Sequence, residues 1–242
     1  VEKTALADAE VEYKDHTSNT IFVPFKVKKS NKDFLQGSNV IIWTTTPWTI
    51  PANRALAFNS AIEYSLIEID DLENFKDKKI IVATNLIDSI VQSCDIKNFK
   101  IIKNFNGSEF TGTICNHPFF NLNYKYDVPM LDARFVNLEQ GTGIVHCAPS
   151  HGPDDFNLCL KHNIPSKYTV DNAGYYTSEI PYFEKTHVFK ADKIVIEKLK
   201  DEKKLIKDDK LQHSYPHSWR SKAPLIYRAT PQWFISMEKN SL

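Results

Sequence analysis

The chain has 242 residues, 42% of them hydrophobic and 25% charged, which is enough for one large domain with its own core. Its 30 lysines and arginines cancel its 30 aspartates and glutamates, so no overall charge recruits nucleic acid. No apolar run approaches the ~20 residues of a membrane span, and we expect no membrane association. Four widely spaced cysteines indicate reduced thiols and a cytoplasmic protein, or one imported into an organelle.

Short strands dominate the predicted secondary structure, because segments rich in β-branched and aromatic residues alternate with polar turns. The predicted strands are 20–27, 40–45, 64–69, 79–84, 100–105, 126–136 and 141–148. Helices are expected at 84–94 and 190–205, where apolar residues recur at helical spacing. Many strands, few helices and no regular βαβ alternation favour a mainly β fold, a β-barrel or sandwich core with peripheral helices.

The most unusual stretch is WTTTPWTIPANRA, residues 43–55, with three adjacent hydroxyls in an apolar setting. In a strand, Thr44 and Thr46 share one face and Thr45 takes the other, until Pro47 ends the pairing. Threonine hydroxyls donate and accept hydrogen bonds without titrating, so they can position a water or a substrate oxygen. Threonine is also an ordinary strand residue, so this stretch alone does not define a site.

A second stretch, GTGIVHCAPSHGPDDF, covers residues 141–156. His146 is expected on a short strand, and Pro153 with two aspartates predicts the first turn of a helix. The helix dipole favours a carboxylate there, so one of Asp154 and Asp155 needs no functional role. Because the two neighbours point in different directions, the other can face a cavity and bind an ammonium group.

The same stretch leaves other chemistries open. Its residues of metal-ligating type are His146, Cys147, His151, Asp154 and Asp155. The prolines and the glycine between them break the regular spacing of a helical metal site, although a metal-dependent hydrolase using His146 and His151 stays an alternative. Cys147 paired with a histidine would be a nucleophile, but no other segment supports an acyl-enzyme. A β-barrel module that binds RNA without chemistry is a further alternative.

The two stretches, together with HSYPHSWRSKAPLIYRATPQWFISM at 213–237, resemble the editing domain of isoleucyl-tRNA synthetase, the insertion called connective polypeptide 1. The valyl and leucyl enzymes carry a Thr-Thr-Arg-Pro type of segment where this chain has Thr-Thr-Pro-Trp. PANRA and HGPDDF are similar to the bacterial or organellar branch. Cys147 and Ser150 depart from the Thr and Gly of the family pattern, and His217-Ser218 replaces a cysteine-containing stretch, which removes the case for a structural zinc.

The resemblance implies a β-barrel core of the valyl/isoleucyl/leucyl-tRNA synthetase editing-domain type. Residues 1–212 would be the editing domain with an N-terminal connecting arm, and 213–242 a return arm toward a synthetic core outside this chain. The implied parent enzyme ligates isoleucine to tRNA(Ile) with ATP and Mg²⁺. The editing domain itself would need no cofactor and no metal. It would act as a monomeric fragment on the 3′ acceptor end of tRNA(Ile).

Editing answers a physical limit. A pocket shaped for isoleucine rejects valine by only about 1–3 kcal/mol, and isoleucyl-tRNA synthetase is the standard example. A second site that admits valine and excludes isoleucine can hydrolyse Val-tRNA(Ile), and valyl-adenylate is a second candidate substrate. The substrate-binding residues that the resemblance implies are Thr44, Thr45, Thr46, Thr49, Asn53, His146 and Asp155.

Within that set, the resemblance makes Thr44 and Thr46 the catalytic pair that holds the attacking water or the substrate oxygens. His146 would limit side-chain size and Asp155 would bind the α-ammonium group, leaving Asp154 as a helix-start residue. No general base is assigned, so we expect catalysis by positioning and electrostatics, helped by a hydroxyl of the terminal ribose.

Two surfaces are candidates for the tRNA contact. The lysine-rich segment 190–210 is one, although alternating Asp and Glu also fit an ordinary solvated helix face. The other is a set of exposed aromatic rings, Trp48 or the tyrosines of 173–183, on which single-stranded bases could stack.

Overall fold

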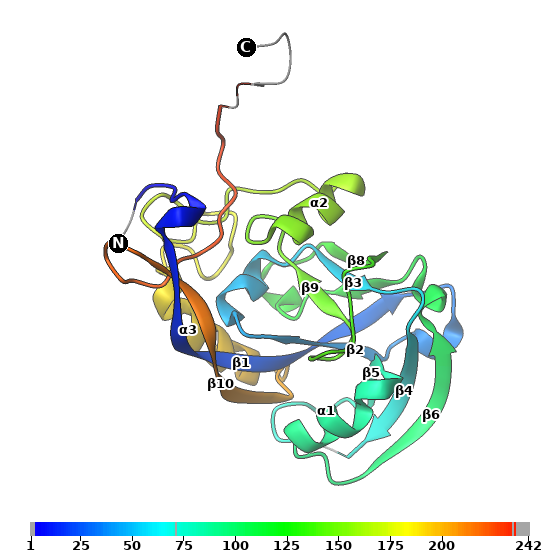
Figure 1. The fold of residues 1–242 in the computed structure, drawn as a ribbon. Coiled ribbons are helices and arrows are strands. Elements are labelled where there is room, and N and C mark those ends of the chain that lie inside the picture. Colours follow the sequence, from blue (N-terminus) through cyan, green and yellow to red (C-terminus); the bar gives the residue numbers. More distant parts are fainter. Residues whose placement is uncertain (1–2, 71, 234, 236–242) are drawn as a thin grey trace.

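The computed structural model describes residues 3–70, 72–233 and 235. Ten strands form one mixed sheet with few helices around it, which confirms the mainly β prediction (Figure 1). The strands are β1 (Val11–Lys29), β2 (Asn39–Thr44), β3 (Ala55–Phe58), β4 (Glu63–Ile69), β5 (Lys79–Ala83), β6 (Phe99–Asn106), β7 (Ile114–Asn116), β8 (Asp127–Asp132), β9 (Val145–Cys147) and β10 (Lys207–Ser218).

The sheet is open. Its hydrogen-bonded order is β6-β4-β5-β2-β1-β7-β8-β3-β9, with β10 on β1, and within the described residues β6 and β9 do not pair with each other. The barrel expected from the resemblance is therefore not closed by strand pairing. The physical reason lies before β9, where Gly141 and Gly143 take φ values of +81° and +74° and break the extended run. The predicted strand 141–148 consequently shortens to three residues.

The sheet nevertheless curls until its two halves face each other. The amide of Ala83, at the end of β5, donates to the carbonyl of Thr142 (2.8 Å), and the Thr142 hydroxyl donates to the carbonyl of Ile41 on β2 (2.6 Å). These bonds hold the segment before β9 against β5 and β2, which are not its neighbours in the strand order. They bring the end of β2 close to β9, where the predicted site residues lie.

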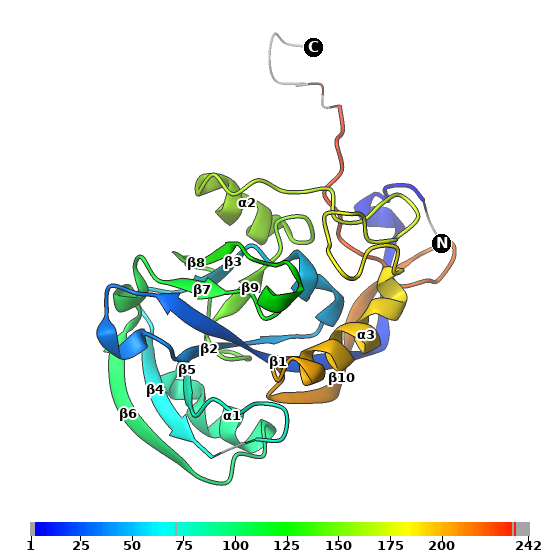
Figure 2. The same ribbon diagram turned by 180° about the vertical axis from the view of Figure 1, so that it is seen from behind.

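In the described part of the chain, three α-helices accompany the sheet: α1 (Ile87–Ser93), α2 (Pro153–Lys161) and α3 (Val188–Asp201). Figures 1 and 2 show α1 beside β4 and β5, α2 over β3 and β8, and α3 beside β1 and β10. The predicted helices at 84–94 and 190–205 and the helix start at Pro153 are confirmed. None of the helices among these residues is long and apolar enough to cross a membrane.

The strands β1 and β10 form a long antiparallel ribbon in which Val11 lies opposite Ser218 and Phe22 opposite Lys207. The start of β1 and the end of β10 therefore lie side by side (Figure 1). The predicted boundary between 212 and 213 falls within β10, and the division into a domain and a return arm stays a prediction. Residues 234 and 236–242 of that arm lie outside the described residues.

Two hydrophobic clusters fill the interior. The larger one lies inside the curved sheet. The smaller one joins α2 to β3 and β9 through small and sulfur-containing side chains. Its central members are Ala55, Ala57, Cys147, Leu158 and Cys159. This packing sets α2 against the end of β9.

Candidate active site

Three hydroxyls gather where β2 ends. Thr44 Oγ1 accepts from the Thr46 amide (3.1 Å) and lies 3.1 Å from Thr46 Oγ1, which is 3.4 Å from Thr49 Oγ1. Thr44 and Thr46 do share a side, although the cause is a turn closed by the Thr44 side chain and not a continuing strand. The Thr45 hydroxyl makes no hydrogen bond within the part of the chain that the structure describes. Thr49 begins the link to the rest of the site.

His146 is held at both ring nitrogens. Thr49 Oγ1 lies 2.8 Å from Nε2, and the Asn53 side-chain nitrogen lies 3.0 Å from Nδ1. The same Asn53 nitrogen donates to the carbonyl of Ala55 (2.8 Å), which can only accept, so the orientation of the amide is determined. Asn53 therefore donates to Nδ1. The proton of the neutral ring must then sit on Nε2 and point at Thr49.

The pKa of His146 is lowered to about 3, chiefly by burial and further by the nearby His151. The Asn53 amide acts in the same direction, because an added proton on Nδ1 would face another donor. His146 is therefore neutral at physiological pH, and neither nitrogen is available to take a proton. The ring can support and shape this site, but it cannot serve as a general base toward the threonines.

The two aspartates at the start of α2 differ in their surroundings. Asp154 is exposed, whereas Asp155 turns inward and accepts from the Ala148 amide at Oδ2 (2.8 Å). Burial raises the pKa of Asp155 to about 6, while the Ala148 bond lowers it and Asp154 raises it. Among the described residues nothing donates to Oδ1. One carboxylate oxygen is thus anchored, and the other is free to accept from a ligand.

The two stretches meet through the end of β9. Ala148, which holds Asp155, is two residues beyond His146, a distance of about 6–7 Å in extended chain. His146 in turn binds Thr49 and Asn53 from the other stretch. The structure therefore brings together the threonine cluster, His146 and Asn53 through bonds that span more than ninety positions of sequence. Asp155 is tied to the same segment by a local bond, at Ala148.

Sequence reasoning missed the groups that hold the turn η3 (Pro47–Ala52) in place. The Trp48 amide donates to Asp192 Oδ1 on α3 (3.0 Å), and the Tyr176 hydroxyl donates to the Trp48 carbonyl. The ring of His151 packs edge-on against Trp48 with centroids 4.8 Å apart. Trp48 is only 7% exposed, so the prediction that it offers an exposed stacking surface is wrong. No local signal in the sequence marks Asp192 or Tyr176 for this role.

The alternative chemistries find little support. His151 is engaged at both nitrogens, by the Tyr227 carbonyl (3.0 Å) and Thr169 Oγ1 (2.8 Å). Within the described ranges no group of three or more His, Cys, Asp or Glu side chains is arranged to hold a metal ion. Burial raises the pKa of Cys147 well above its ordinary value, so the group is a thiol and not a nucleophilic thiolate. All four cysteines are buried and unbridged.

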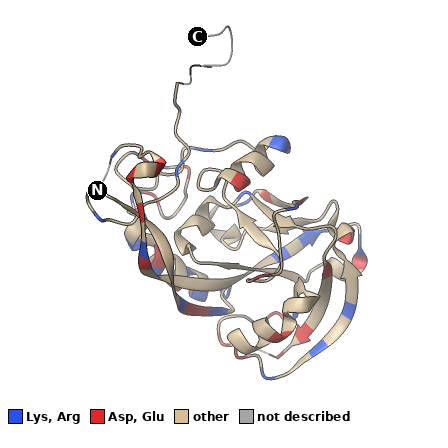
Figure 3. Cartoon of the chain, in the orientation of Figure 1, with Lys and Arg blue, Asp and Glu red and all other residues tan. Residues whose placement is uncertain are grey.

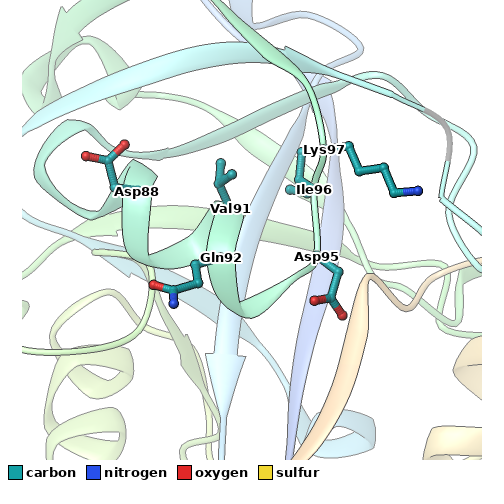
Figure 4. A pocket seen from close by; sticks show the side chains of 6 residues that line it. All are labelled: Asp88, Val91, Gln92, Asp95, Ile96 and Lys97. Carbon is teal, nitrogen blue, oxygen red and sulfur yellow. The ribbon is translucent and has the colours of Figure 1, made fainter.

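Two cavities stand out among the described residues, and neither is lined by a predicted site residue. One is a shallow hollow of about 400 Å³ beside α1, with Val91 and Ile96 at its centre and Asp88 and Lys97 at its opposite ends (Figure 4). The other, of about 210 Å³, lies against η3 and is lined by Arg54 and Ser150 among others. The pocket for valine that the resemblance implies is therefore not one of these two cavities.

The lysine-rich segment 190–210 carries charges of both signs (Figure 3). Its lysines pair with nearby carboxylates, as Lys198 does with Glu202 (3.5 Å) and Lys200 with Asp208 (3.0 Å). This pattern fits an ordinary solvated surface. Tyr175 and Tyr182, in contrast, are 43% and 61% exposed and remain candidates for stacking on a single strand.

Solved structures with the same fold are editing domains of leucyl-tRNA synthetases. The crystal structure of GlLeuRS-CP1 matches with a TM-score of 0.60 at 13% identity, covering 78% of this chain and 98% of that chain. The editing domain of the P. falciparum cytosolic leucyl-tRNA synthetase matches with a TM-score of 0.56 at 12% identity and the same coverage. At these identities the likeness is one of fold. It places the architecture in the class of synthetase editing domains.

The family model described as leucyl-tRNA synthetase, editing domain, matches residues 18–210, and the chain belongs to this family. The isoleucine–tRNA ligase of Pelagibacter ubique is 64% identical over 242 residues, which cover all of this chain and 27% of that protein. The isoleucine–tRNA ligase of Gluconobacter oxydans is 44% identical over 98% of this chain and 27% of its own length. The resemblance to bacterial isoleucyl editing domains is confirmed, and the chain spans about a quarter of these relatives.

Proposed function

We propose that this chain is the editing part of an isoleucine–tRNA ligase and hydrolyses the ester that links valine to tRNA(Ile) while excluding isoleucine. The observation that carries the proposal is the Asp155 carboxylate, which is largely buried, anchored through one oxygen and unpaired at the other among the described residues. Such a group is suited to bind the α-ammonium of an aminoacyl ester. Relatives named isoleucine–tRNA ligase, at 44% and 64% identity, support the choice of isoleucine tRNA.

The threonine cluster suits the positioning of a water. Thr44 Oγ1 accepts from the Thr46 amide and lies 3.1 Å from Thr46 Oγ1, so the two hydroxyls share a hydrogen bond in which either can donate. Thr46 is only half-buried, which leaves a lone pair of its hydroxyl for a water or a ribose hydroxyl. Because His146 is neutral and capped at Nδ1, the attacking water would be oriented by hydroxyls and would lose its proton to the substrate or to solvent.

The locked imidazole suits a size limit. Bonds to both nitrogens and 8% exposure leave the His146 ring little freedom to turn away from a larger side chain. The nearby Trp48 is likewise held through its amide and its carbonyl. A wall that cannot yield turns the extra methylene of isoleucine into a steric clash. In this scheme ATP and Mg²⁺ serve only the synthetic core of the parent enzyme.

The test compares deacylation of Val-tRNA(Ile) and Ile-tRNA(Ile) by the purified chain and by two matched variants. Asp155→Asn keeps the shape but removes the charge, and we expect it to slow valine release by at least about 30-fold. Asp154→Asn changes the exposed neighbour and should retain the wild-type rate. Equal release of valine and isoleucine by the wild type, or an Asp155→Asn variant as fast as wild type, would refute the proposal.

Unfolding of the variant would not explain such a loss. Because the pKa of Asp155 in the folded chain is raised to about 6, its ionised form destabilises the fold at pH 7, and this cost disappears as the pH falls below about 4. Asp155→Asn should therefore be at least as stable as wild type at pH 7. Urea unfolding of the same preparations checks this.

A further inference from the structure

The cavity of about 210 Å³ against η3 contains an arginine without an acidic partner among the described residues. The Arg54 guanidinium lies over the ring of Tyr126, 4.4 Å from its centroid, and the residue is half-buried. Its Nε is buried and has no hydrogen-bond partner. Nowhere in the described ranges does the guanidinium form an ion pair. A buried donor left unpaired is costly, so this arrangement indicates a site that an acceptor completes.

The charges around the cavity favour an anion. The other charged groups that line it, Lys167 and Glu179, pair with each other at 2.5 Å. The Arg54 charge is therefore not neutralised, and the lining of the cavity has a net charge of +1. The hydroxyls of Ser150 and Thr169 add polar groups to the wall. Guanidinium groups bind phosphate through paired N–H donors more readily than any other side chain does.

The cavity adjoins the candidate active site on two sides. Arg54 directly follows Asn53, whose carbonyl accepts from the Tyr126 hydroxyl (2.8 Å) and whose amide holds His146. Ser150 is two residues beyond Ala148, which anchors Asp155. Two residues span at most about 7 Å, and here the chain turns, so the separation is no larger than that. A strand whose terminal ester lies at Asp155 would thus have its neighbouring backbone within reach of Arg54.

We propose that this cavity binds a backbone phosphate of the tRNA acceptor end, with the Arg54 guanidinium as the principal contact. This inference rests on the proposed function, since it takes the substrate to be an aminoacylated RNA. The phosphate would accept from the part of the Arg54 guanidinium that lines the cavity, beside the buried Nε. Binding it would fix the register of the single-stranded end relative to Asp155 and the threonines. No bond is made or broken at this cavity.

The first measurement uses the whole chain and needs no hydrolysis. In ¹H–¹⁵N spectra, titration with inorganic phosphate should shift the Arg54 Nε–H signal, with the exposed Arg134 as the reference that stays in place. An oligoribonucleotide that ends in CCA and carries no amino acid should produce a larger shift of this signal at lower concentration. A phosphate shift without any effect of the oligonucleotide would mean a site for free anions only, and it would overturn the proposal.

The second measurement is the affinity for the same oligonucleotide. Arg54→Gln should weaken it by about tenfold or more and reduce the log–log salt slope by about 0.7, the share of one phosphate contact. Arg54→Lys should recover part of the affinity, because lysine keeps the positive charge. The recovery should be incomplete, because lysine lacks the paired N–H donors of a guanidinium group. Arg134→Gln is the matched control and should bind as wild type does. Unchanged affinity and salt slope in Arg54→Gln would refute the phosphate contact.

A double-mutant cycle identifies which phosphodiester of the oligonucleotide contacts Arg54. Each of the last two phosphodiesters is replaced in turn by a neutral methylphosphonate, and one replacement should weaken binding to wild type while having no effect on Arg54→Gln. Losses that simply add in both proteins would contradict a direct contact. If binding behaves as expected but Val-tRNA(Ile) is not hydrolysed, the phosphate site stands and the proposed hydrolysis falls.

Discussion

At the scale of single residues, burial shifts the pKa of the His146 imidazole and the pKa of the Asp155 carboxyl group in opposite directions. Burial lowers the pKa of His146 to about 3 and raises that of Asp155 to about 6. In each case the low-dielectric surroundings disfavour the charged form. The histidine is thereby removed from acid–base chemistry, whereas the aspartate stays ionised at neutral pH with a free oxygen.

The pH dependence of editing follows from this pair. As the pH falls through about 6, Asp155 becomes protonated and can no longer attract an ammonium group, so kcat/KM for Val-tRNA(Ile) should fall about tenfold per unit below that point. His146 should add no inflection between pH 5 and 8, since it stays neutral throughout. Initial rates corrected for spontaneous ester hydrolysis test this. A profile that stays flat between pH 7 and 5 would contradict the role of Asp155.

At the scale of elements, the position of the short strand β9 depends on Gly143, two residues before the strand begins. Gly143 has a φ of +74°, and a Cβ there would lie 2.4 Å from the Cβ of Ala83 at the end of β5. Its carbonyl also accepts from the Tyr64 hydroxyl (2.8 Å). The end of β5 and the segment before β9 approach each other closely at Gly143. This contact fixes the position of β9 and therefore the position of His146.

A matched pair of glycines tests that statement. Gly37 has nearly the same φ, +75°, and a methyl group added there would meet nothing within 4 Å, so Gly37→Ala should cost only the left-handed backbone term of about 1–2 kcal/mol. Gly143→Ala should cost clearly more, because the new methyl group also forces β5 and β9 apart. Urea unfolding of the two variants gives the difference. Equal destabilisation would show that the close approach at Gly143 is not important.

At the scale of the whole molecule, three histidines link stability to pH: His117 and His146 are buried, and His151 is half-buried. His117, His146 and His151 have pKa values lowered to about 3, 3 and 4, in each case mainly by burial. His117 also supports η3, because its Nε2 donates to the Ile50 carbonyl (3.0 Å) while its Nδ1 accepts from the Phe119 amide. The folded chain must therefore exclude protons that the unfolded chain binds below its ordinary histidine pKa of about 6.5.

Acid should consequently begin to destabilise this protein as the pH falls below about 6.5. Each histidine contributes stability that is complete above about pH 6.5 and is lost at about 1.4 kcal/mol per pH unit as the pH falls toward its folded pKa. Three together amount to about 4 kcal/mol per unit, and Asp155 offsets about 1.4 kcal/mol per unit of this between pH 6 and 4 because its pKa is raised; the remainder is a large fraction of the stability of a typical domain. We expect the free energy of unfolding to fall steeply between pH 6.5 and 4. His117→Gln should flatten that slope by one proton, and a stability independent of pH down to 4.5 would contradict this account.

Much of the fold was readable from local pattern. Alternation and β-branched residues located β4, β5 and β6 within a residue of their observed ends, and Pro153 marked the start of α2. The strands that were missed lacked such a signal. β3 is a short, Ala-rich segment, β7 has three residues, and β10 is so charged that it resembles a solvated surface. β10 is a strand because twelve consecutive residues of β1 lie opposite it.

The sequence by itself determined the mainly β class, the two polar stretches that carry the candidate site, and the resemblance that joins them to one family. Only the tertiary structure decided that the sheet stays open, that Asp155 and not Asp154 turns inward, and that Asn53 directs the proton of His146 to Thr49. Residue types and spacing are local properties of a chain. The bonds that hold His146 and the segment before β9 join residues about a hundred positions apart, and their geometry exists only once the sheet has curled.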